Sequence, residues 1–476
     1  MKIRKSHVFI IIAAVLAVTL FSFWWSDGLR RKLALQTVDS IHDLAVNRMR
    51  DNAAHGSGTA AEFIDIPIEV TQISPDIFQV TGVANTHVIS TPQGNVMFDT
   101  GLSLQVPKQM EVLQAAVPKR PLTHIIVSHS HADHTGGVKF WRQAETEIIT
   151  HVEFIEEQRY LTELQPYFYA RNRLLFPFMP ENPPTLEILK YGGIEPTITI
   201  ADDETYEFEL GGRQFEVMAM PGAEGADNIV LWLPESKILF SGDFFGPIFP
   251  QFPNVFTMRG EKIRKPVEYI QSLNRIIELD PEMIVPSHLS PVTDKQEIMA
   301  GLVRIRDAVA YVHDRTVAGM NEGKTLHELM AEISLPPELE LTQIHGRVSW
   351  AVKSIWQYYA TWFHFDRTTA LYAVPQHKIY GDIVELGGID GLVSRAERYL
   401  ADGQAVAALH LLEIVTASAT GRLTPDMAVS ADMIPALNTQ KKALQVLLQQ
   451  AENGLGNSYE IYWLTSQIRM IDALTP

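Results

Sequence analysis

Short apolar runs alternate with turn signals and helix-like stretches between residues 63 and 291, a pattern that predicts an α/β domain. The predicted strands cover residues 77–83, 87–90, 96–98, 125–127, 148–150, 214–218, 229–233, 238–241 and 284–285. Pro221-Gly222 and Gly242-Asp243 directly follow two of these runs. Loops that follow rigid strands commonly carry functional side chains, so these turns are candidate parts of a site.

From residue 296 onward the pattern changes to helical periodicity. A stripe of apolar side chains at helical spacing marks one predicted amphipathic helix and consists of Leu437, Leu444, Leu447, Leu448 and Ala451. The sequence shows no short repeat of the solenoid type. We therefore interpret this part as an all-α packing or oligomerisation domain.

A basic N-terminus precedes a charge-free run over residues 8–25, which predicts a membrane segment. As a helix, the run spans about 27 Å, close to the ~30 Å hydrocarbon core of a bilayer. It ends at Trp24 and Trp25, which suit a membrane interface, and it lacks a small-residue cleavage pattern. A retained signal-anchor and a cleaved signal peptide both fit the run, and a buried helix is the remaining alternative.

These patterns divide the chain into four predicted parts: a signal-anchor or signal peptide (1–28), a helical tether (29–61), an α/β domain (62–295) and an all-α domain (296–476). Either reading of the first part predicts an exported protein, at the periplasmic face, membrane-anchored or secreted.

Composition narrows the chemistry. The 476 residues include 39 Lys+Arg and 56 Asp+Glu, a net charge of −17 that disfavours binding to nucleic acid. Cysteine is absent, which excludes disulfides, thiolate metal sites and a cysteine nucleophile. A metal site in this chain must be built from nitrogen and oxygen ligands, and sixteen histidines are available.

The strongest chemical signal is the segment 128–137, Ser-His-Ser-His-Ala-Asp-His-Thr-Gly-Gly, directly after a predicted strand. His129 and His131 alternate on extended backbone and therefore point to the same side. Asp133 and His134 follow where the chain turns toward a helix. Four ligand-type side chains within six residues can hold two metal ions a few Å apart.

The H-x-H-x-D-H pattern after a strand resembles the metallo-β-lactamase superfamily. Residues 96–101, which end in Asp99-Thr100-Gly101, resemble the "IDTG" turn of that family. The resemblance implies an αββα sandwich for the α/β domain. It also implies that Asp99 orients the metal loop rather than ligating metal.

The resemblance extends the predicted ligand set to the ends of later strands, at Glu224, Asp243 and His288. An acidic residue at position 224, where most of the superfamily has histidine, is a feature of type III alkylsulfatases. The implied centre holds two zinc ions, although other divalent metals also accept such ligands. His129, His131 and Glu224 would bind one ion, Asp133, His134 and His288 the other, and Asp243 would bridge them.

Other segments resemble alkylsulfatases specifically. Residues 254–260 resemble their N-x-x-T-L-R-G segment, in which Asn254 and Arg259 would hold the sulfate head. Segments 311–323, 335–337 and 346–363 resemble the alkylsulfatase dimerisation domain and imply a homodimer. The sterol-carrier-like C-terminal domain of that family is not expected here. His313 and His345, far from the ligands in sequence, are expected to be structural.

The predicted function is zinc-dependent hydrolysis of organic (alkyl) sulfate esters by a metal-activated water, with Asp133, Arg259 and Asn254 as the catalytic residues. The alternatives are another hydrolase of the same fold, acting on a lactam, lactone or phosphate ester, and a non-catalytic, membrane-tethered binding or assembly protein. An aromatic-rich stretch over residues 154–179 fits either an apolar wall near the active site or the ordinary packing of a two-helix cap.

Overall fold

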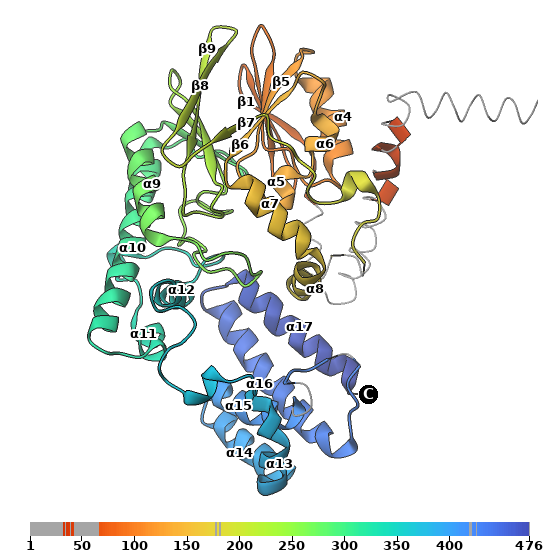
Figure 1. Cartoon of the computed structure of the whole chain (residues 1–476), viewed down its shortest axis with the longest axis vertical. Coiled ribbons are helices and arrows are strands. Elements are labelled where there is room, and N and C mark those ends of the chain that lie inside the picture. The colour runs from red at the N-terminus through yellow and green to blue at the C-terminus, as the bar shows by residue number, and fades with distance from the viewer. Residues whose placement is uncertain are drawn as a thin grey trace, which may run out of the picture.

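The protein is an αββα sandwich followed by a helical half, as seen in a computed structural model (Figure 1). The structure describes residues 32–33, 35–38, 40–41, 66–176, 179, 182–417, 421–424 and 426–475. The predicted membrane segment over residues 8–25 lies outside these residues. Within them, no helix combines the length and apolar character that crossing a bilayer requires.

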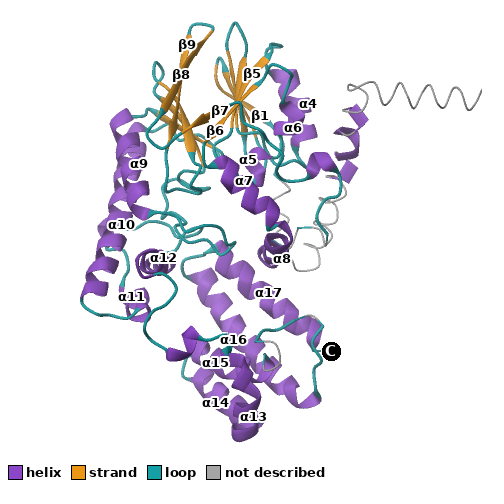
Figure 2. Ribbon diagram, in the orientation of Figure 1, coloured by secondary structure: helices purple, strands orange, loops and turns teal. Residues whose placement is uncertain are grey.

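Two mixed sheets form the centre of the sandwich (Figure 2). The first sheet runs in chain order and consists of β1 (Val70–Ser74), β2 (Ile77–Val80), β3 (Thr86–Ser90), β4 (Asn95–Phe98), β5 (Leu122–Ile126), β6 (Glu147–His151) and β7 (Ile198–Ile200). The second has the order β12 (Met283–Pro286), β11 (Ile238–Gly242), β10 (Ile229–Leu233), β9 (Arg213–Ala219) and β8 (Thr205–Leu210). Strands β4–β7 are parallel, as are β11 and β12.

Side-chain alternation along the strands explains why the two sheets stack. In β4, Val96 and Phe98 point toward the second sheet and join a fully buried core with Phe215 and Leu231, whereas Met97 points to the outer helices. Apolar side chains on both faces make β4 and β10 continuous buried runs.

Helices cover both outer faces. The first sheet is covered by α4 (Val106–Ala116), α5 (Ala132–Thr135) and α6 (Val138–Trp141), and the second by α9 (Pro266–Leu279) and α10 (Lys295–Asn321). Asp294 caps the start of helix α10, and its carboxylate accepts from the backbone N–H groups of Gln296 and Glu297. It then continues beyond the sandwich and connects it to the helical half (Figure 1).

The helical half consists of α11 (Leu326–Glu332), α12 (Val348–Ala360), α13 (Tyr380–Gly387), α14 (Ile389–Ala401), α15 (Ala405–Thr416), α16 (Ile434–Asn453) and α17 (Ser458–Leu474). The predicted apolar stripe lies on α16, where Leu437, Leu444 and Ala451 are buried against Leu464 and Ile471 of α17. Helix α17 returns to the sandwich and contacts α8 (Gln165–Leu175).

The nine strands expected from the sequence are all present, with bounds that differ by up to three residues. Three strands were not expected, namely β1, β7 and β8. The aromatic-rich stretch forms α7 (Phe154–Glu163) and α8, a two-helix cap over one end of the sandwich (Figure 1).

A candidate metal centre at the carboxyl ends of the strands

The candidate metal ligands converge because they follow strands that end at the same edge of the sandwich. His129 and His131 follow β5, Asp243 follows β11 and His288 follows β12. Neighbouring parallel strands end side by side. The loops that follow β4 and β5 therefore lie together at the edge of one sheet, and the loops that follow β11 and β12 lie together at the edge of the other. Open α/β sheets commonly bind ligands at this edge.

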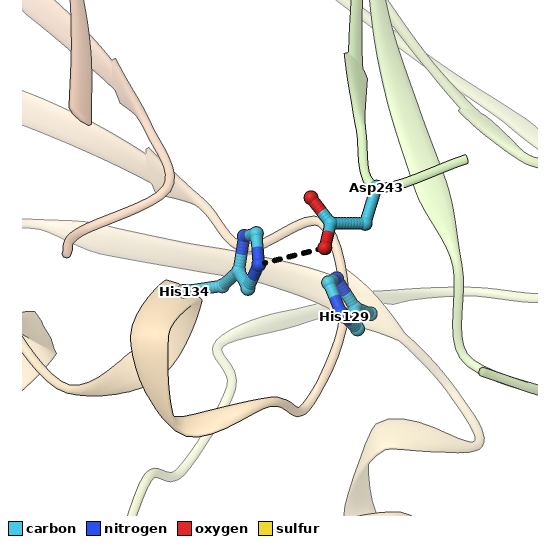
Figure 3. Close-up of side chains that lie close together, drawn as sticks. All are labelled: His129, His134 and Asp243. Carbon is cyan, nitrogen blue, oxygen red and sulfur yellow. Dashed lines mark ion pairs between the residues drawn. The ribbon is translucent and has the colours of Figure 1, made fainter. Parts of the chain in front are cut away.

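Two overlapping groups of side chains have ligand atoms close enough to hold a metal ion. The first comprises His129, His134 and Asp243 (Figure 3), and the second comprises Asp133, His134 and His288. The Nε2 atom of His134 lies 3.4 Å from a carboxylate oxygen of Asp243 and 3.6 Å from one of Asp133. The Nε2 atom of His288 lies 3.1 Å from the same oxygen of Asp243.

Burial and neighbouring charges shift the pKa values of His134 and Asp243 in opposite directions. Burial disfavours the protonated imidazole of His134, but the carboxylates of Asp243, Asp133 and Asp99 outweigh it and raise its pKa well above the usual value. Burial likewise raises the pKa of Asp243, but His288 and His134 hold it well below the usual range.

Asp99 orients the ligand-bearing loop through hydrogen bonds, as the sequence predicts. Its carboxylate accepts from Nδ1 of His134 at 2.8 Å and from the backbone N–H of Ser128 at 2.8 Å. The hydroxyls of Ser128 and Ser287 donate to Oδ2, the oxygen that also accepts from His134, so one side chain connects the loops after β5 and β12. Because Nδ1 of His134 donates to Asp99, the ring is held with its Nε2 toward the centre.

The turn after the ligand motif depends on glycine. Gly137 adopts an ordinary helical conformation, but a Cβ at this position would lie 2.0 Å from the carbonyl oxygen of Thr100 and 2.8 Å from the Trp141 ring. The hydroxyl of Thr100 also accepts from the Gly137 N–H and donates to the carbonyl of His134. The metal loop therefore packs directly on the turn that follows β4.

We expect Gly137→Ala to lower the free energy of unfolding by about 1–3 kcal/mol, because the added methyl group overpacks this contact. Thermal unfolding of the two proteins measures the difference. Gly391→Ala is the matched control, since a Cβ there meets nothing within 4 Å and alanine favours the helix α14. Equal melting temperatures for the Gly137 variant and the unsubstituted protein would contradict the packing described.

His131 meets a carboxylate that the sequence did not predict. Its Nδ1 atom lies 2.7 Å from Nε2 of His129, and its Nε2 atom lies 3.3 Å from a carboxylate oxygen of Glu261. Burial raises the pKa of Glu261, but Arg259 and His131 outweigh burial and lower it to about 2. Glu261 is therefore an anion beside the metal ligands.

Glu224, the predicted third ligand of the first ion, is held by cations. One carboxylate oxygen lies 2.7 Å from Arg264 and 3.1 Å from Arg259, and the other lies 3.0 Å from Nε2 of His345. Burial raises the pKa of Glu224, but Arg264 first, then His345 and Arg259, hold it well below the usual range. The structure thus places Glu224 beside the centre but outside the two ligand groups, because two guanidinium groups bind its carboxylate. Its role as a ligand stays a prediction.

Arg259 and Asn254, the predicted sulfate-binding residues, both lie beside the centre. The guanidinium of Arg259 lies 3.4 Å from Nε2 of His131, and its carbonyl oxygen accepts from Arg171 of α8. Asn254 is buried, and its Nδ2 lies 3.4 Å from Nε2 of His345. The side-chain oxygen of Asn254 has no hydrogen-bond partner within the described residues.

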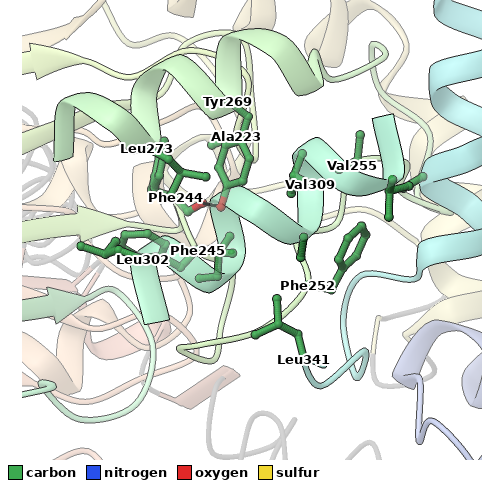
Figure 4. Close-up of a cluster of buried hydrophobic side chains, with 14 of the residues drawn as sticks. Ala223, Phe244, Phe245, Phe252, Val255, Tyr269, Leu273, Leu302, Val309 and Leu341 are labelled. Carbon is green, nitrogen blue, oxygen red and sulfur yellow. Dashed lines mark hydrogen bonds between the residues drawn. The ribbon is translucent and has the colours of Figure 1, made fainter. Parts of the chain in front are cut away.

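A buried cluster supports the loops that carry Glu224 and Asp243. Ala223 and Phe244, their neighbours in sequence, pack with Tyr269 and Leu273 of α9 (Figure 4). The Tyr269 hydroxyl donates to the carbonyl of Phe244 at 3.0 Å, which fixes the turn after β11. Residues of α10 and of the helical half complete this cluster, so the helical half supports the site through packing.

Sequence reasoning missed four residues of the site. Glu261 and Arg264 follow Arg259 closely, and this run of alternating charges was the available signal. His345, expected to be structural, instead contacts Glu224 and Asn254. Tyr459, on α17, lies beneath Arg259 with its ring 5.9 Å from the guanidinium carbon.

The described residues fit a divalent metal. Nε2 of His134 and Oδ1 of Asp243 are buried and have no hydrogen-bond partner in the part of the chain that the structure describes. Buried polar atoms in proteins are nearly always satisfied, so these atoms point to a missing partner. The ring nitrogens of His129 and His131 face each other at 2.7 Å, within hydrogen-bond distance, so both rings point to the same place. Imidazole and carboxylate suit zinc and related divalent metals.

Comparison with known proteins agrees with this architecture. Residues 80–288 match the metallo-beta-lactamase superfamily, and residues 325–457 match the alkyl sulfatase dimerisation family. The chain therefore carries a metallo-β-lactamase domain, which implies binding of divalent metal, followed by an alkyl sulfatase dimerisation domain. Among hydrolases of this superfamily, it resembles the alkylsulfatases.

The relatives include a linear primary-alkylsulfatase of a Pseudomonas species, 29% identical over 336 residues, which cover 66% of this chain and 63% of that protein. An alkyl/aryl-sulfatase of Saccharomyces cerevisiae is 22% identical over 70% of this chain and 55% of its own length. The structure of the stereoselective inverting sec-alkylsulfatase of Pseudomonas sp. superposes with a TM-score of 0.70 at 21% identity, covering 86% of this chain and 66% of that chain. The chain thus spans between half and two thirds of the length of these relatives.

Proposed function

We propose that this protein is a metal-dependent hydrolase of organic sulfate esters. The observation that carries the proposal is the position of the Arg259 guanidinium, 3.4 Å from His131 and next to a histidine–carboxylate cluster with unpartnered buried ligand atoms. Arginine presents a planar fork of donors that suits a tetrahedral oxyanion. The similarity to alkylsulfatases supports the same substrate class.

In this proposal, the ligand set expected from the sequence would hold two zinc ions, and Asp243 would be among the ligands. Zinc supplies Lewis acidity when bound, lowering the pKa of water and neutralising charge on the sulfate. Arg259 and Asn254 orient the sulfate through charge-assisted and neutral hydrogen bonds. Asp133 is more exposed than Asp243 and is the carboxylate that we assign to orienting the attacking water.

Assays of the zinc-loaded full chain against alkyl sulfates, phosphate esters, lactams and lactones test the proposal. We expect release of inorganic sulfate and no comparable turnover of the other classes. Turnover confined to a phosphate ester, lactam or lactone would replace the proposed function. Reaction in oxygen-18 water then identifies the bond that breaks, because label that appears only in sulfate excludes C–O cleavage.

We further propose that the protein forms a homodimer through its helical half. Large apolar side chains are exposed within the alkyl sulfatase dimerisation domain, and they comprise Trp362, Phe365, Leu371, Tyr372 and Leu386. Phe365 is 90% exposed and Leu386 is 89% exposed. Exposed apolar surface of this density is typical of a protein–protein interface.

The double substitution Trp362→Glu and Phe365→Glu is expected to convert the dimer to monomer, because it places charges in an apolar interface. Light scattering coupled to gel filtration measures the mass of each protein. Leu164→Glu is the control, since Leu164 is 47% exposed but lies between α7 and α8, outside the dimerisation domain. A double variant that remains dimeric would show that the interface lies elsewhere.

The last part of the proposal concerns the location of the protein. The charge-free run over residues 8–25 lies outside the described residues, and we propose that it carries the folded part across a membrane. Cell fractionation of the full chain, compared with a chain that lacks residues 1–28, tests this location.

A further inference from the structure

A cavity of about 270 Å³ opens beside the metal centre on the side of His131. Its walls are α7, the start of the loop after β7, and the segment that follows Arg259. The side chains on which the argument rests are Glu153, Glu157, Tyr160, Asp202, Glu261 and Lys262. Small-molecule sites in proteins have volumes of about 300–1,000 Å³, so this cavity suits a small ligand.

Charged side chains are frequent in the lining, although more of its surface is apolar than polar. Carboxylates outnumber cationic side chains in it by five to three, and few of its lining residues are aliphatic. Ligand sites are usually lined mainly by apolar and aromatic side chains, with a few polar groups that fix orientation. A long alkyl chain in this cavity would therefore take charged groups out of water without pairing them.

The inner wall holds polar groups that are already withdrawn from water. Glu157 is 4% exposed and Tyr160 is 9% exposed. Lys262 lies over both, with its Nζ 2.8 Å from Glu157 and 4.9 Å from the centre of the Tyr160 ring. The Tyr160 hydroxyl has no hydrogen-bond partner within the described residues. A buried hydroxyl without a partner normally signals a missing ligand or water.

The mouth of the cavity is acidic. Glu153 is exposed, and the Asp202 side chain is 59% exposed and lies 3.0 Å from His151. The cavity thus offers carboxylate acceptors at its mouth, from Glu153 and Asp202, and at its inner wall, from Glu157.

We infer that this cavity binds the organic group of the substrate and that it selects short sulfate esters bearing hydroxyl or ammonium donors. An alkyl chain would displace water from Glu157 and Tyr160 without replacing the hydrogen bonds that water makes. A donor-bearing chain satisfies these acceptors while Arg259 holds the sulfate. This inference rests on the proposed sulfatase function and names its substrate class.

Matched esters of equal size isolate the effect of the donor. The zinc-loaded full chain is assayed with 2-hydroxyethyl sulfate, 2-aminoethyl sulfate and n-propyl sulfate, and with octyl sulfate as the long-chain member. We expect kcat/KM to favour a donor-bearing ester over n-propyl sulfate by about 10-fold or more, because a site built for hydrogen bonds rejects analogues that lack them. Equal values for the three short esters, or the highest value for octyl sulfate, would overturn the inference.

Two variants attribute the selectivity to the inner wall. Tyr160→Phe and Glu157→Gln should each reduce the preference for donor-bearing esters while turnover of n-propyl sulfate persists. Glu163→Gln is the matched control, because Glu163 lies on α7 outside the cavity lining and pairs with Arg159. An unchanged preference in both inner-wall variants would remove these residues from the site.

A failure of the proposed function is distinguishable from a failure of this inference. If none of the esters releases sulfate, the sulfatase function fails, and calorimetric titration of the same intact esters then decides the inference. Tighter binding of 2-hydroxyethyl or 2-aminoethyl sulfate than of n-propyl sulfate supports the donor-selective cavity, and equal binding contradicts it.

Discussion

Asp243→Ala is expected to lower kcat/KM for a sulfate ester by roughly 10³-fold, which corresponds to about 4 kcal/mol of transition-state stabilisation. Asp243 is the carboxylate closest to the Nε2 atoms of both His134 and His288, at 3.4 Å and 3.1 Å. Its removal would take a negatively charged ligand from the proposed metal centre. The variant should therefore lose bound metal together with activity.

Metal analysis by mass spectrometry and steady-state assays measure the two losses on the same preparation, and circular dichroism confirms that the variant is folded. Asp314→Ala is the control, because the Asp314 side chain is 78% exposed and lies outside the site. An Asp243 variant that kept its full complement of metal and its activity would exclude Asp243 as a ligand.

Arg259→Leu is expected to raise KM for a sulfate ester by about 10²-fold, since loss of a buried charged hydrogen-bond donor typically costs about 2–5 kcal/mol. Arg264 still binds both Glu224 and Glu261 in this variant, so the carboxylates around Arg259 keep a cationic partner. Arg259→Lys should recover part of the loss, because lysine keeps the charge but not the planar fork.

Inhibition by inorganic sulfate separates binding from chemistry in these variants. The inhibition constant should rise in parallel with KM in Arg259→Leu. Arg306→Leu removes an arginine that pairs with Asp307 outside the site and should change neither value. Unchanged sulfate inhibition in Arg259→Leu would place the sulfate elsewhere.

Local sequence patterns predicted most of the fold. Strands buried on both faces, such as β10, are apolar throughout and stand out from their surroundings. The alternation of Tyr206, Phe208 and Leu210 in β8 is also visible, but the charged residues between them masked it because this edge strand has one exposed face. With only three residues, β7 is too short for any periodicity to identify it.

The residues of the site likewise fall into those that the sequence predicted and those that it did not. The histidines and aspartate of residues 129–134 are close in sequence, so their spacing alone indicated a metal site. His345, in the loop before α12, and Tyr459, on α17, lie more than 100 residues beyond Glu224 in the chain. Only tertiary packing, such as that of α17 against α8, brings them to the centre. The sequence also contained no sign that Arg259 and Arg264 bind Glu224, because proximity in space decides which carboxylate an arginine binds.

Titration of the metal-stripped full chain with zinc tests the central claim most directly. Release of sulfate from a short sulfate ester is measured at each zinc equivalent. The account predicts no release without metal, a rise with added zinc and a plateau at two equivalents per chain. Sulfate release that is undetectable at every zinc level, or that is equally fast in the metal-stripped protein, would contradict it.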